Sequence, residues 1–322
     1  MKAIICTKYG PPDVLQLKEV KNPAPRNNEV CIKIFATAVT ASDCIIRGFK
    51  VSTRRWLLGR LFLGLTKPRK SILGLVLVGE IETVGKHVKR FQTGDRVYAF
   101  TGFRFGAYAE YTCLPENSVM AFKPPQMTYE EAAAVPYGGL LAMHFLRKGE
   151  IQSGQKVLIY GASGAIGTSA VQLARHFGAE VTGVCSTTNL ALVKSLGADS
   201  AIDYTQEEFT NKGELYDLVF DAVGKRKSSP LKLQCSQALT PNGKYISVDD
   251  GSPQPRREDL HFFNELIEAG QLQAVIDRCY SLEQIVEAHR YVETGHKKGN
   301  VVITVAQSNS PQQSAVVDGG AI

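Results

Sequence analysis

Apolar and polar residues form short strand-like runs through the first part of the chain. The runs cover residues 2–6, 30–38, 73–84, 93–98 and 107–112. Turns rich in glycine, proline and asparagine separate them, because these residues adopt the backbone conformations that turns require. The pattern predicts a β-rich first domain that ends near the Lys-Pro-Pro sequence at 123–125.

From residue 128 onward, helical and extended patterns alternate. Thr128 and Glu131 have the spacing of a capping box, in which each side chain bonds the other residue's backbone N–H at a helix start. Strands alternating with helices, with glycines at the helix ends, are typical of a parallel, doubly wound sheet. The expected strands are 156–160, 180–185, 200–204, 215–222, 244–248 and 300–305; the expected helices are 189–196, 231–239, 258–269 and 281–294, with Gly178, Gly197 and Gly243 at helix ends.

One strand and one helix of this region are joined by a glycine-rich turn. Gly161 permits the tight exit from the strand, Gly164 lets the backbone approach a pyrophosphate, and Gly167 lets the helix pack closely on the strand. Unpaired N–H groups at the helix start bind the anion, which the helix dipole also favours. The turn predicts a dinucleotide site with pyrophosphate contacts from Gly161, Ser163, Gly164, Ala165, Ile166 and Gly167.

The residues after the next strand bear on which dinucleotide binds. NAD-specific folds usually carry an acidic residue there, which bonds the ribose 2′-hydroxyl. This chain has Ser-Thr-Thr-Asn at 186–189 and no acid. A 2′-phosphate would meet no like charge, so the sequence favours NADPH over NADH, with Ser186 and Thr188 at the adenosine end.

Composition narrows the remaining choices. The 322 residues suffice for two domains with separate cores. Seven cysteines without a C-x-x-C pair argue against a zinc knuckle or a disulfide framework and suit a reducing cytoplasm. The chain has no apolar run long enough to span a membrane, and its first residues lack the pattern of a signal peptide. We therefore expect a cytoplasmic protein.

The net charge of +6 is concentrated between residues 44 and 79, where basic residues gather without an acidic one. Such a local patch is unlike a nucleic-acid-binding face, so no nucleic acid partner is expected. Residues 57, 58, 61 and 65 form one apolar helical face within it. We interpret segment 54–65 as a packed helix, a lid over the substrate cleft or, last in order, a contact with a membrane surface. The basic residues are Arg47, Lys50, Arg54, Arg55, Arg60, Lys67, Arg69 and Lys70.

Several segments together resemble the medium-chain dehydrogenase/reductase superfamily, specifically its zinc-free quinone-oxidoreductase (zeta-crystallin-like) branch. They are 79–85, 91–97, 106–111, 131–136, 161–167, 196–199, 220–224 and 287–289. The resemblance implies an α/β protein with a GroES-like β-rich catalytic domain and a Rossmann domain with a doubly wound parallel sheet. The implied divisions are 1–122 for the GroES-like domain, 123–270 for the Rossmann domain, 271–306 for a segment returning to the first domain, and 307–322 for a disordered tail.

The resemblance also bears on a catalytic metal. Zinc-dependent relatives carry a Cys at the position of Thr40 and a Gly-His-Glu triplet where this chain has Gly-Leu-Val at 74–76. Zinc needs three or four converging N, S or O ligands, which these residues do not supply. We therefore expect no metal.

Without zinc, no Lewis acid polarises a carbonyl. The resemblance then implies hydride transfer from NADPH to a quinone or an α,β-unsaturated carbonyl, so the expected partner is a small lipophilic compound of that class. Some relatives have a Tyr where this chain has Ile45, which leaves Thr40 and Ser42 as candidate catalytic residues. Asp43 is interpreted as a buried hydrogen-bonding residue.

The resemblance adds three residues to the predicted cofactor site. Tyr204 matches a tyrosine near the adenosine phosphate in relatives, and Val223 and Gly224 would lie beside the ribose after a strand exit. Relatives often pair the 2′-phosphate with an Arg or Lys near Thr188, which is missing here. The preference for NADPH is therefore expected to be weaker than in those relatives.

Alternatives stay open at the level of the sequence. The chain could instead be a zinc-less alcohol dehydrogenase or an enoyl-thioester reductase of the same superfamily. A third alternative is a non-catalytic NADPH-binding (crystallin-like) or nucleic-acid-binding protein. Relatives often dimerise through a further strand before the helix at 258–269, and here the connection is too short for one. We expect a five-stranded or truncated sheet, and a monomer or a non-standard homodimer.

Overall fold

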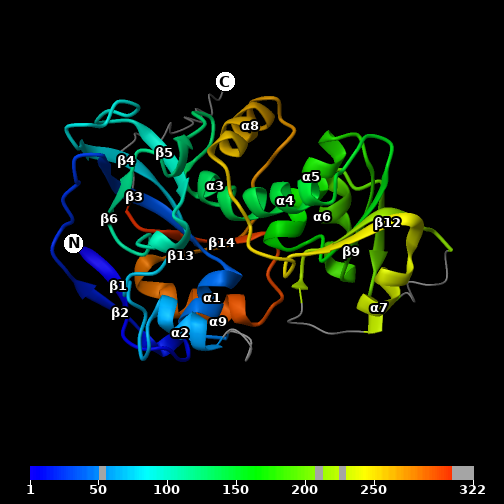
Figure 1. Ribbon diagram of the computed structural model, residues 1–322, viewed down its shortest axis with the longest axis horizontal. Helices are drawn as coiled ribbons and strands as arrows, with labels where there is room; N and C mark the ends of the chain where they lie inside the picture. Colours follow the sequence, from blue (N-terminus) through cyan, green and yellow to red (C-terminus); the bar gives the residue numbers. More distant parts are fainter. Residues whose placement is uncertain (51–55, 207–212, 225–229, 307–322) are drawn as a thin grey trace, which may run out of the picture.

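The computed structural model describes residues 1–50, 56–206, 213–224 and 230–306. Its strands form a seven-stranded and a five-stranded sheet, besides a two-stranded one. The larger sheet lies in the left half of Figure 1 and the five-stranded sheet in the right half. The predicted α/β architecture, a β-rich domain beside a parallel sheet, is confirmed. The domain bounds 1–122, 123–270 and 271–306 stay a prediction, and the expected disordered tail 307–322 lies outside the described residues.

The larger sheet is built around β3 (Glu29–Val39), which is almost entirely buried. β3 pairs antiparallel with β4 (Val76–Val84), β6 (Tyr111–Pro115) and β14 (Asn300–Thr304). The end of the described chain therefore completes the sheet that its beginning starts. The sheet is completed by β5 (Arg96–Phe100), β7 (Val119–Phe122) and β13 (Ile276–Ser281), while β1 (Lys2–Cys6) and β2 (Leu15–Glu19) form a separate two-stranded sheet.

The smaller sheet is parallel, with the strand order β10-β9-β8-β11-β12. Its central strands are buried apolar runs, as expected of a sheet covered on both faces by helices. The predicted five-stranded sheet is confirmed, and β12 and β10 form its two edges. The strands are β8 (Lys156–Tyr160), β9 (Glu180–Cys185), β10 (Ser200–Asp203), β11 (Tyr216–Asp221) and β12 (Leu239–Ser247).

Several predicted element bounds are wrong. Gly243 lies inside β12 rather than at a helix end, because Leu239 already pairs with Tyr216 of β11. The register shifts before Lys244 pairs with Leu218, so the turn-like residues between Leu239 and Lys244 form an irregularity within the strand. A strand was also expected at 107–112, whereas β6 begins at Tyr111 and β4 begins only at Val76. Strands β2, β7 and β13 were not predicted.

Helices connect the sheets and cover them, and α4 (Pro136–Lys148) packs against α5 (Ala165–His176) between the two sheets (Figure 1). The predicted capping box of Thr128 and Glu131 begins α3 (Tyr129–Ala133). None of the described helices combines the length and apolarity needed to cross a bilayer. The other helices are α1 (Ala41–Gly48), α2 (Trp56–Leu63), α6 (Leu190–Ser195), α7 (Pro230–Gln237), α8 (Arg257–Glu268) and α9 (Ile285–Glu293).

The two sheets share buried residues at their junction. One apolar cluster combines Val39 and Cys44 with Tyr137 of α4 and Ala165 of α5. Residues distant in sequence are thereby brought together where α1, α4 and α5 all begin. The Tyr98 hydroxyl adds a polar link, since it donates to the Leu260 carbonyl in α8 at 2.8 Å. Burial of this shared apolar surface fixes the starts of the three helices relative to one another.

Candidate active site

The glycine turn follows β8 and leads into α5. Gly161 has a φ of 80°, which favours glycine, and a Cβ there would lie 2.4 Å from Cγ2 of Val223. A Cβ on Gly167 would lie 2.1 Å from the Gly161 carbonyl oxygen. These two glycines are therefore required by the protein's own packing, and the turn after β11 lies directly against the turn after β8.

Gly164 differs from the other two glycines. It is the N-cap of α5 with extended backbone, and a Cβ there would meet only the Gly161 carbonyl oxygen at 3.5 Å. No side chain within the described ranges caps α5, so its first N–H groups lack a partner from this part of the chain. Packing gives no reason for a glycine here, whereas an anion at the helix start would use the space that a Cβ would fill. The turn fits the pyrophosphate of a dinucleotide, which Gly161, Ser163, Gly164, Ala165, Ile166 and Gly167 would hold.

Asp221, at the end of β11, shapes the neighbouring turn. Its carboxylate accepts hydrogen bonds from the backbone N–H groups of Val223 and Gly224, both at 3.0 Å. The hydroxyls of Tyr245 and Ser247 also donate to it, at 3.0 and 3.2 Å. Sequence reasoning singled out Val223 and Gly224 but missed Asp221 as the residue that orders them. The sequence signal for this role was an aspartate at the end of a predicted strand, two residues before a backbone N–H of the turn that follows.

Hydroxyl and amide groups gather at the end of β9. Asn189 donates from Nδ2 to Oγ of Ser163 at 3.1 Å and to Oγ of Ser186 at 3.2 Å. The Ser186 and Thr188 hydroxyls lie 3.5 Å apart. Asn189 therefore joins the predicted adenosine end to the glycine turn. Tyr204 follows β10, pairs through its backbone N–H with the Cys185 carbonyl, and is 44% exposed.

An acidic residue that the local sequence did not reveal lies beside these hydroxyls. Asp203, the last residue of β10, accepts a hydrogen bond from the Thr187 hydroxyl at 2.5 Å and from Thr205 at 2.6 Å. These hydrogen bonds, that from Thr187 foremost, lower the pKa of Asp203. A negative charge therefore lies next to the Ser-Thr-Thr-Asn stretch, although no acid occurs within it.

Thr40 and Asp43 form a capping box at the start of α1. The Thr40 hydroxyl donates to Oδ2 of Asp43 at 2.5 Å, and the Asp43 N–H donates to the Thr40 hydroxyl oxygen at 3.2 Å. Both residues are buried, and burial raises the pKa of Asp43 to about 6, although the hydrogen bonds from Thr40 lower it. The interpretation of Asp43 as a buried hydrogen-bonding residue is confirmed, and the Thr40 hydrogen is already engaged with it.

Ser42 lies one residue inside α1 and points to a different partner. Its hydroxyl is 2.8 Å from that of Tyr137, in the first turn of α4. Ser42 is partly exposed and Tyr137 is buried, so the pair lies at the edge of the junction between the sheets. Sequence reasoning missed Tyr137, since no local pattern relates residues so far apart in the chain.

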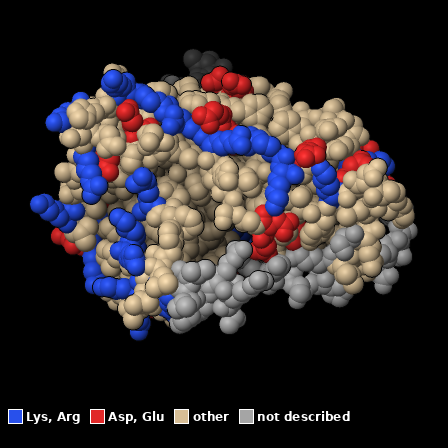
Figure 2. Space-filling view, in the orientation of Figure 1, with Lys and Arg blue, Asp and Glu red and all other residues tan. Residues whose placement is uncertain are grey.

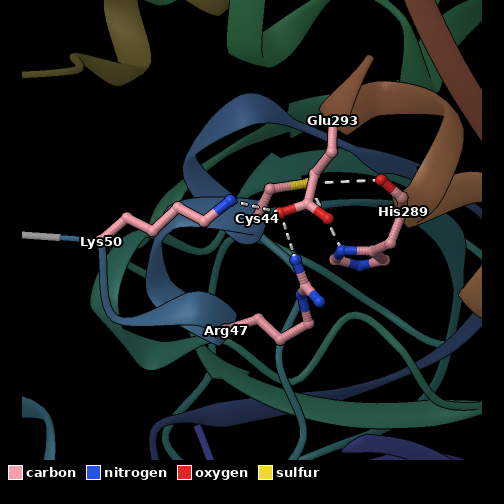
Figure 3. A network of polar contacts seen from close by, with 5 residues as sticks. All are labelled: Cys44, Arg47, Lys50, His289 and Glu293. Atoms are coloured by element: carbon pink, nitrogen blue, oxygen red, sulfur yellow. Dashed lines mark hydrogen bonds and ion pairs between the residues drawn. The ribbon is translucent and has the colours of Figure 1, made fainter. Parts of the chain in front are cut away.

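A polar network lies behind α1, between that helix and α9 (Figure 3). Arg47 is fully buried and pairs with Glu293 at 2.6 Å, and Lys50 pairs with the same carboxylate at 2.9 Å. Arg47 therefore differs from the other basic residues of this stretch, because a buried cation requires a partner. The Nδ1 atom of His289 lies 3.4 Å from the Cys44 sulfur. Burial lowers the pKa of His289 to about 3.

Helix α2 has one packed face and one exposed face. Arg60 lies over the rings of Phe49 and Tyr9, with its guanidinium carbon 4.0 and 4.7 Å from their centroids. Phe62, 62% exposed, contacts Phe103 edge to face at 5.2 Å. In Figure 2, many Lys and Arg side chains lie in the left half of the molecule, which is the half that carries α2 in Figure 1. Residues 54 and 55 of the predicted segment lie outside the described residues.

The residues at the positions of the zinc ligands do not fit a metal. Thr40 is engaged in the capping box, and Leu75 is buried in the apolar core. Within the described part of the chain, three or more His, Cys, Asp or Glu side chains do not gather anywhere in a ligand-like group. The absence of a metal stays a prediction.

Known families match both sheets of the molecule. A model described as alcohol dehydrogenase GroES-like domain matches residues 26–124, and one described as zinc-binding dehydrogenase matches 165–276. The 2-methylene-furan-3-one reductase of Solanum lycopersicum is 36% identical, over 94% of this chain and 79% of that protein. The chloroplastic NADPH-dependent alkenal/one oxidoreductase of Arabidopsis thaliana is 32% identical, with the same coverage.

A solved structure agrees with these matches. The quinone oxidoreductase from Coxiella burnetii superposes with a TM-score of 0.83 at 29% identity, and covers 95% of this chain and 99% of its own. The similarity therefore extends over nearly the whole chain.

Proposed function

This chain belongs to the medium-chain dehydrogenase/reductase superfamily, in its zinc-free quinone oxidoreductase branch, and on that premise we propose that it is an NAD(P)H-dependent oxidoreductase. Its acceptor is a quinone or an α,β-unsaturated carbonyl. The observation that carries the proposal is the uncapped start of α5, which meets the start of α1 at the junction of the sheets. The activities that the names of the relatives state support the choice of acceptor.

The chain's own residues bind and orient the reactants. The glycine turn supplies backbone N–H groups to the pyrophosphate, and Asp221 orders the turn of Val223 and Gly224 beside it. The cofactor, when bound, supplies the hydride. NADPH is proposed over NADH, with Ser186, Thr188 and Tyr204 at the adenosine end. The negative charge of Asp203 nearby supports a modest preference rather than a strict one.

Completing the reduction requires a proton at the acceptor after the hydride has added. Of the two candidates, we assign the donor role to Ser42 and a positioning role to Thr40. The Thr40 hydroxyl is buried and donates to Asp43, whereas Ser42 is partly exposed and its hydroxyl bonds that of Tyr137. Ser42 can give its proton to the acceptor and regain one through the Tyr137 hydroxyl, which in turn takes up a proton from solvent at the edge of the junction between the sheets.

Steady-state kinetics with purified protein test the proposal. The acceptors are a water-soluble benzoquinone, an enone and a crotonyl thioester, each with NADPH and with NADH. Turnover of the quinone or the enone, faster with NADPH, is the expected result. Selective turnover of the thioester would favour the enoyl-thioester reductase alternative. Saturable NADPH binding without turnover of any acceptor would favour a non-catalytic protein.

The remaining features of the proposal concern association and location. A monomer, or a homodimer that does not use the β12 edge, is supported by the direct run from β12 into α8 without another strand. The exposed apolar side chains Leu61 and Phe62 of α2, and Leu65 after it, keep the membrane-surface alternative open for segment 54–65. Equal liposome co-sedimentation of the unchanged chain and Phe62→Ser/Leu65→Ser would remove it. A cytoplasmic location stays a prediction.

A further inference from the structure

Two cysteines of the larger sheet face each other across adjacent strands. Cys31 of β3 pairs directly with Cys113 of β6 in the antiparallel register. Residues opposite each other in such a pair project their side chains on the same face of the sheet, so the two thiols lie side by side. The other cysteines that lie in strands pair with residues of other types, namely Cys6 with Leu15, Cys185 with Asp203 and Cys279 with Val302.

The backbone hydrogen bonds of β3 and β6 place the two cysteines at a position that suits a disulfide. At one end of the pairing, the Ile34 N–H donates to the Glu110 carbonyl at 2.8 Å. At the other end, the Glu116 N–H donates to the Asn28 carbonyl at 3.0 Å. Hydrogen-bonded and non-hydrogen-bonded pairs alternate along an antiparallel ladder, so the cysteine pair, three positions from each end, is non-hydrogen-bonded. The Cα atoms of such pairs lie about 4.5 Å apart, within the range of about 4.4–6.8 Å that a disulfide spans.

The two thiols also differ in acidity because they interact with each other. A hydrogen bond from the Cys113 thiol lowers the pKa of Cys31, although burial and Glu82 raise it. The same interaction, more than burial, raises the pKa of Cys113. Cys31 is therefore the partner that forms a thiolate, and the thiolate is the form in which cysteine sulfur acts as a nucleophile.

A small oxidant can reach the pair from the side of Cys113. Cys113 is partly exposed, whereas Cys31 is buried. Among the described strands, β6 pairs with β3 only, so it lies at an edge of the sheet. Cys31 lies near the start of β3, and the junction of the two sheets lies at its far end, beyond Val39. Most of the length of β3 therefore separates the cysteine pair from the candidate active site.

We propose that Cys31 and Cys113 form a reversible disulfide when the protein meets a hydroperoxide. The Cys31 thiolate attacks the hydroperoxide, so that an S–O bond forms, the O–O bond breaks and an alcohol or water leaves. The Cys113 thiol then attacks the Cys31 sulfur, so that the S–S bond forms, the S–O bond breaks and water leaves. The two sulfurs lose two electrons, which the hydroperoxide gains, and the two thiol protons leave with the products.

The disulfide links an edge strand to the strand around which the larger sheet is built. It closes a loop of about 80 residues, and such a cross-link stabilises a protein chiefly by constraining its unfolded chain. In a reducing compartment both thiols stay free, and the bond forms only while an oxidant is present. The inference concerns the larger sheet rather than the cofactor site, so it stands or falls separately from the proposed function.

Peptide mapping of the full chain by mass spectrometry, before and after treatment with hydrogen peroxide, tests the proposal. The treatment continues until Cys279, which is exposed, is oxidised, so that each sample has met enough oxidant. The expected product is one cross-linked pair of peptides that contains Cys31 and Cys113 and that dithiothreitol separates again. Two free thiols at these positions, or separate oxidation of each to a sulfinic or sulfonic acid, would overturn the proposal.

Thermal unfolding of the oxidised and reduced chain distinguishes the cross-link from oxidation elsewhere. The unfolding midpoint of the unchanged chain should rise by about 5 °C on oxidation and return with dithiothreitol. Cys31→Ser and Cys113→Ser should show no such rise, because each removes one half of the disulfide. The matched control, Cys279→Ser, removes an exposed cysteine and should behave like the unchanged chain. A rise of equal size in Cys31→Ser or Cys113→Ser would contradict the assignment.

Discussion

Two helices begin at the junction of the sheets, and their first turns differ in one respect. The start of α1 is closed by its own side chains, because Thr40 and Asp43 satisfy each other's backbone N–H groups. The start of α5 has Gly164 as its N-cap, and no side chain from the described residues bonds its N–H groups. Both helices lie against one apolar cluster, so packing does not account for the difference.

The difference separates a helix start closed by its own side chains from one whose N–H donors remain available to an anion. A capping side chain stabilises a helix by about 1 kcal/mol and occupies the donors that an anion would use. α5 forgoes that stabilisation and retains its donors, as a pyrophosphate site requires. The same comparison explains why Thr40 is a poor proton donor: its hydroxyl hydrogen belongs to the cap. Adding a capping side chain at the start of α5 should therefore raise the stability of the chain and weaken anion binding. Removing the cap of α1 should lower the stability.

The largest effect is expected from Gly164→Asp, which would give α5 the kind of cap that α1 has. The backbone at Gly164 is extended and the space beside it is open, so aspartate fits without strain. The new carboxylate should stabilise the chain by roughly a few tenths of a kcal/mol and weaken NADPH binding by about a hundredfold or more. Chemical denaturation and fluorescence titration measure the two quantities.

The matched control is Thr128→Asp, which places the same charge at the N-cap of α3, where a capping box already exists. It should leave NADPH affinity unchanged. Tight NADPH binding by Gly164→Asp would show that the α5 start is not the pyrophosphate site.

Ser42→Ala should lower kcat by about a hundredfold, because it removes the proposed proton donor without touching the cap. Its unfolding midpoint and NADPH affinity should stay unchanged. Thr40→Ser is the companion variant, and since it retains the hydroxyl that caps α1, its kcat should remain close to the original value. Comparable kcat values for Ser42→Ala and the unchanged chain would show that another group or solvent donates the proton.

Asp43 gives the closed helix start a pH dependence. Burial raises its pKa to about 6 in the folded chain, above the value of 3.8 for an unperturbed aspartate. The folded state then binds the proton more tightly, so this contribution to the free energy of unfolding is present at low pH and is lost as pH rises through about 6. Between pH 4 and pH 6 the loss should reach about 2 kcal/mol.

His289 acts in the opposite direction, since its lowered pKa of about 3 destabilises the folded chain as pH falls. The Asp43 effect is therefore measured as the difference between the unchanged chain and Asp43→Asn over this range. A pH-independent difference would mean that Asp43 does not titrate there.

The smallest effect is expected at the adenosine end. Asp203→Asn removes a negative charge beside Thr187 and should raise the preference for NADPH over NADH by about threefold, measured as a ratio of dissociation constants. Glu180→Gln removes an equal charge at the far end of the neighbouring strand and should leave the ratio unchanged. An unchanged ratio in Asp203→Asn would show that the carboxylate does not act on the 2′-phosphate.

Local patterns in the sequence determined the parts of this protein that depend on near neighbours. Two such parts could be predicted because each depends only on residues a few positions apart. They are the strand, glycine turn and helix at 156–176 and the capping box at Thr128. Segment bounds failed where pairing overrode local preference, as when Leu239 joined β12 through its contact with Tyr216.

Only the tertiary structure decided which side chains meet. Ser42 bonds Tyr137, Asp203 bonds Thr187, Arg47 is buried against Glu293, and Gly299 bonds Ser163. The partners in these contacts lie on different elements, and composition or periodicity does not encode which strand or helix will be adjacent. The sequence by itself therefore determined the cofactor turn and the two sheets. The packing of the sheets determined where the hydroxyls lie around that turn, because it alone brings those elements together.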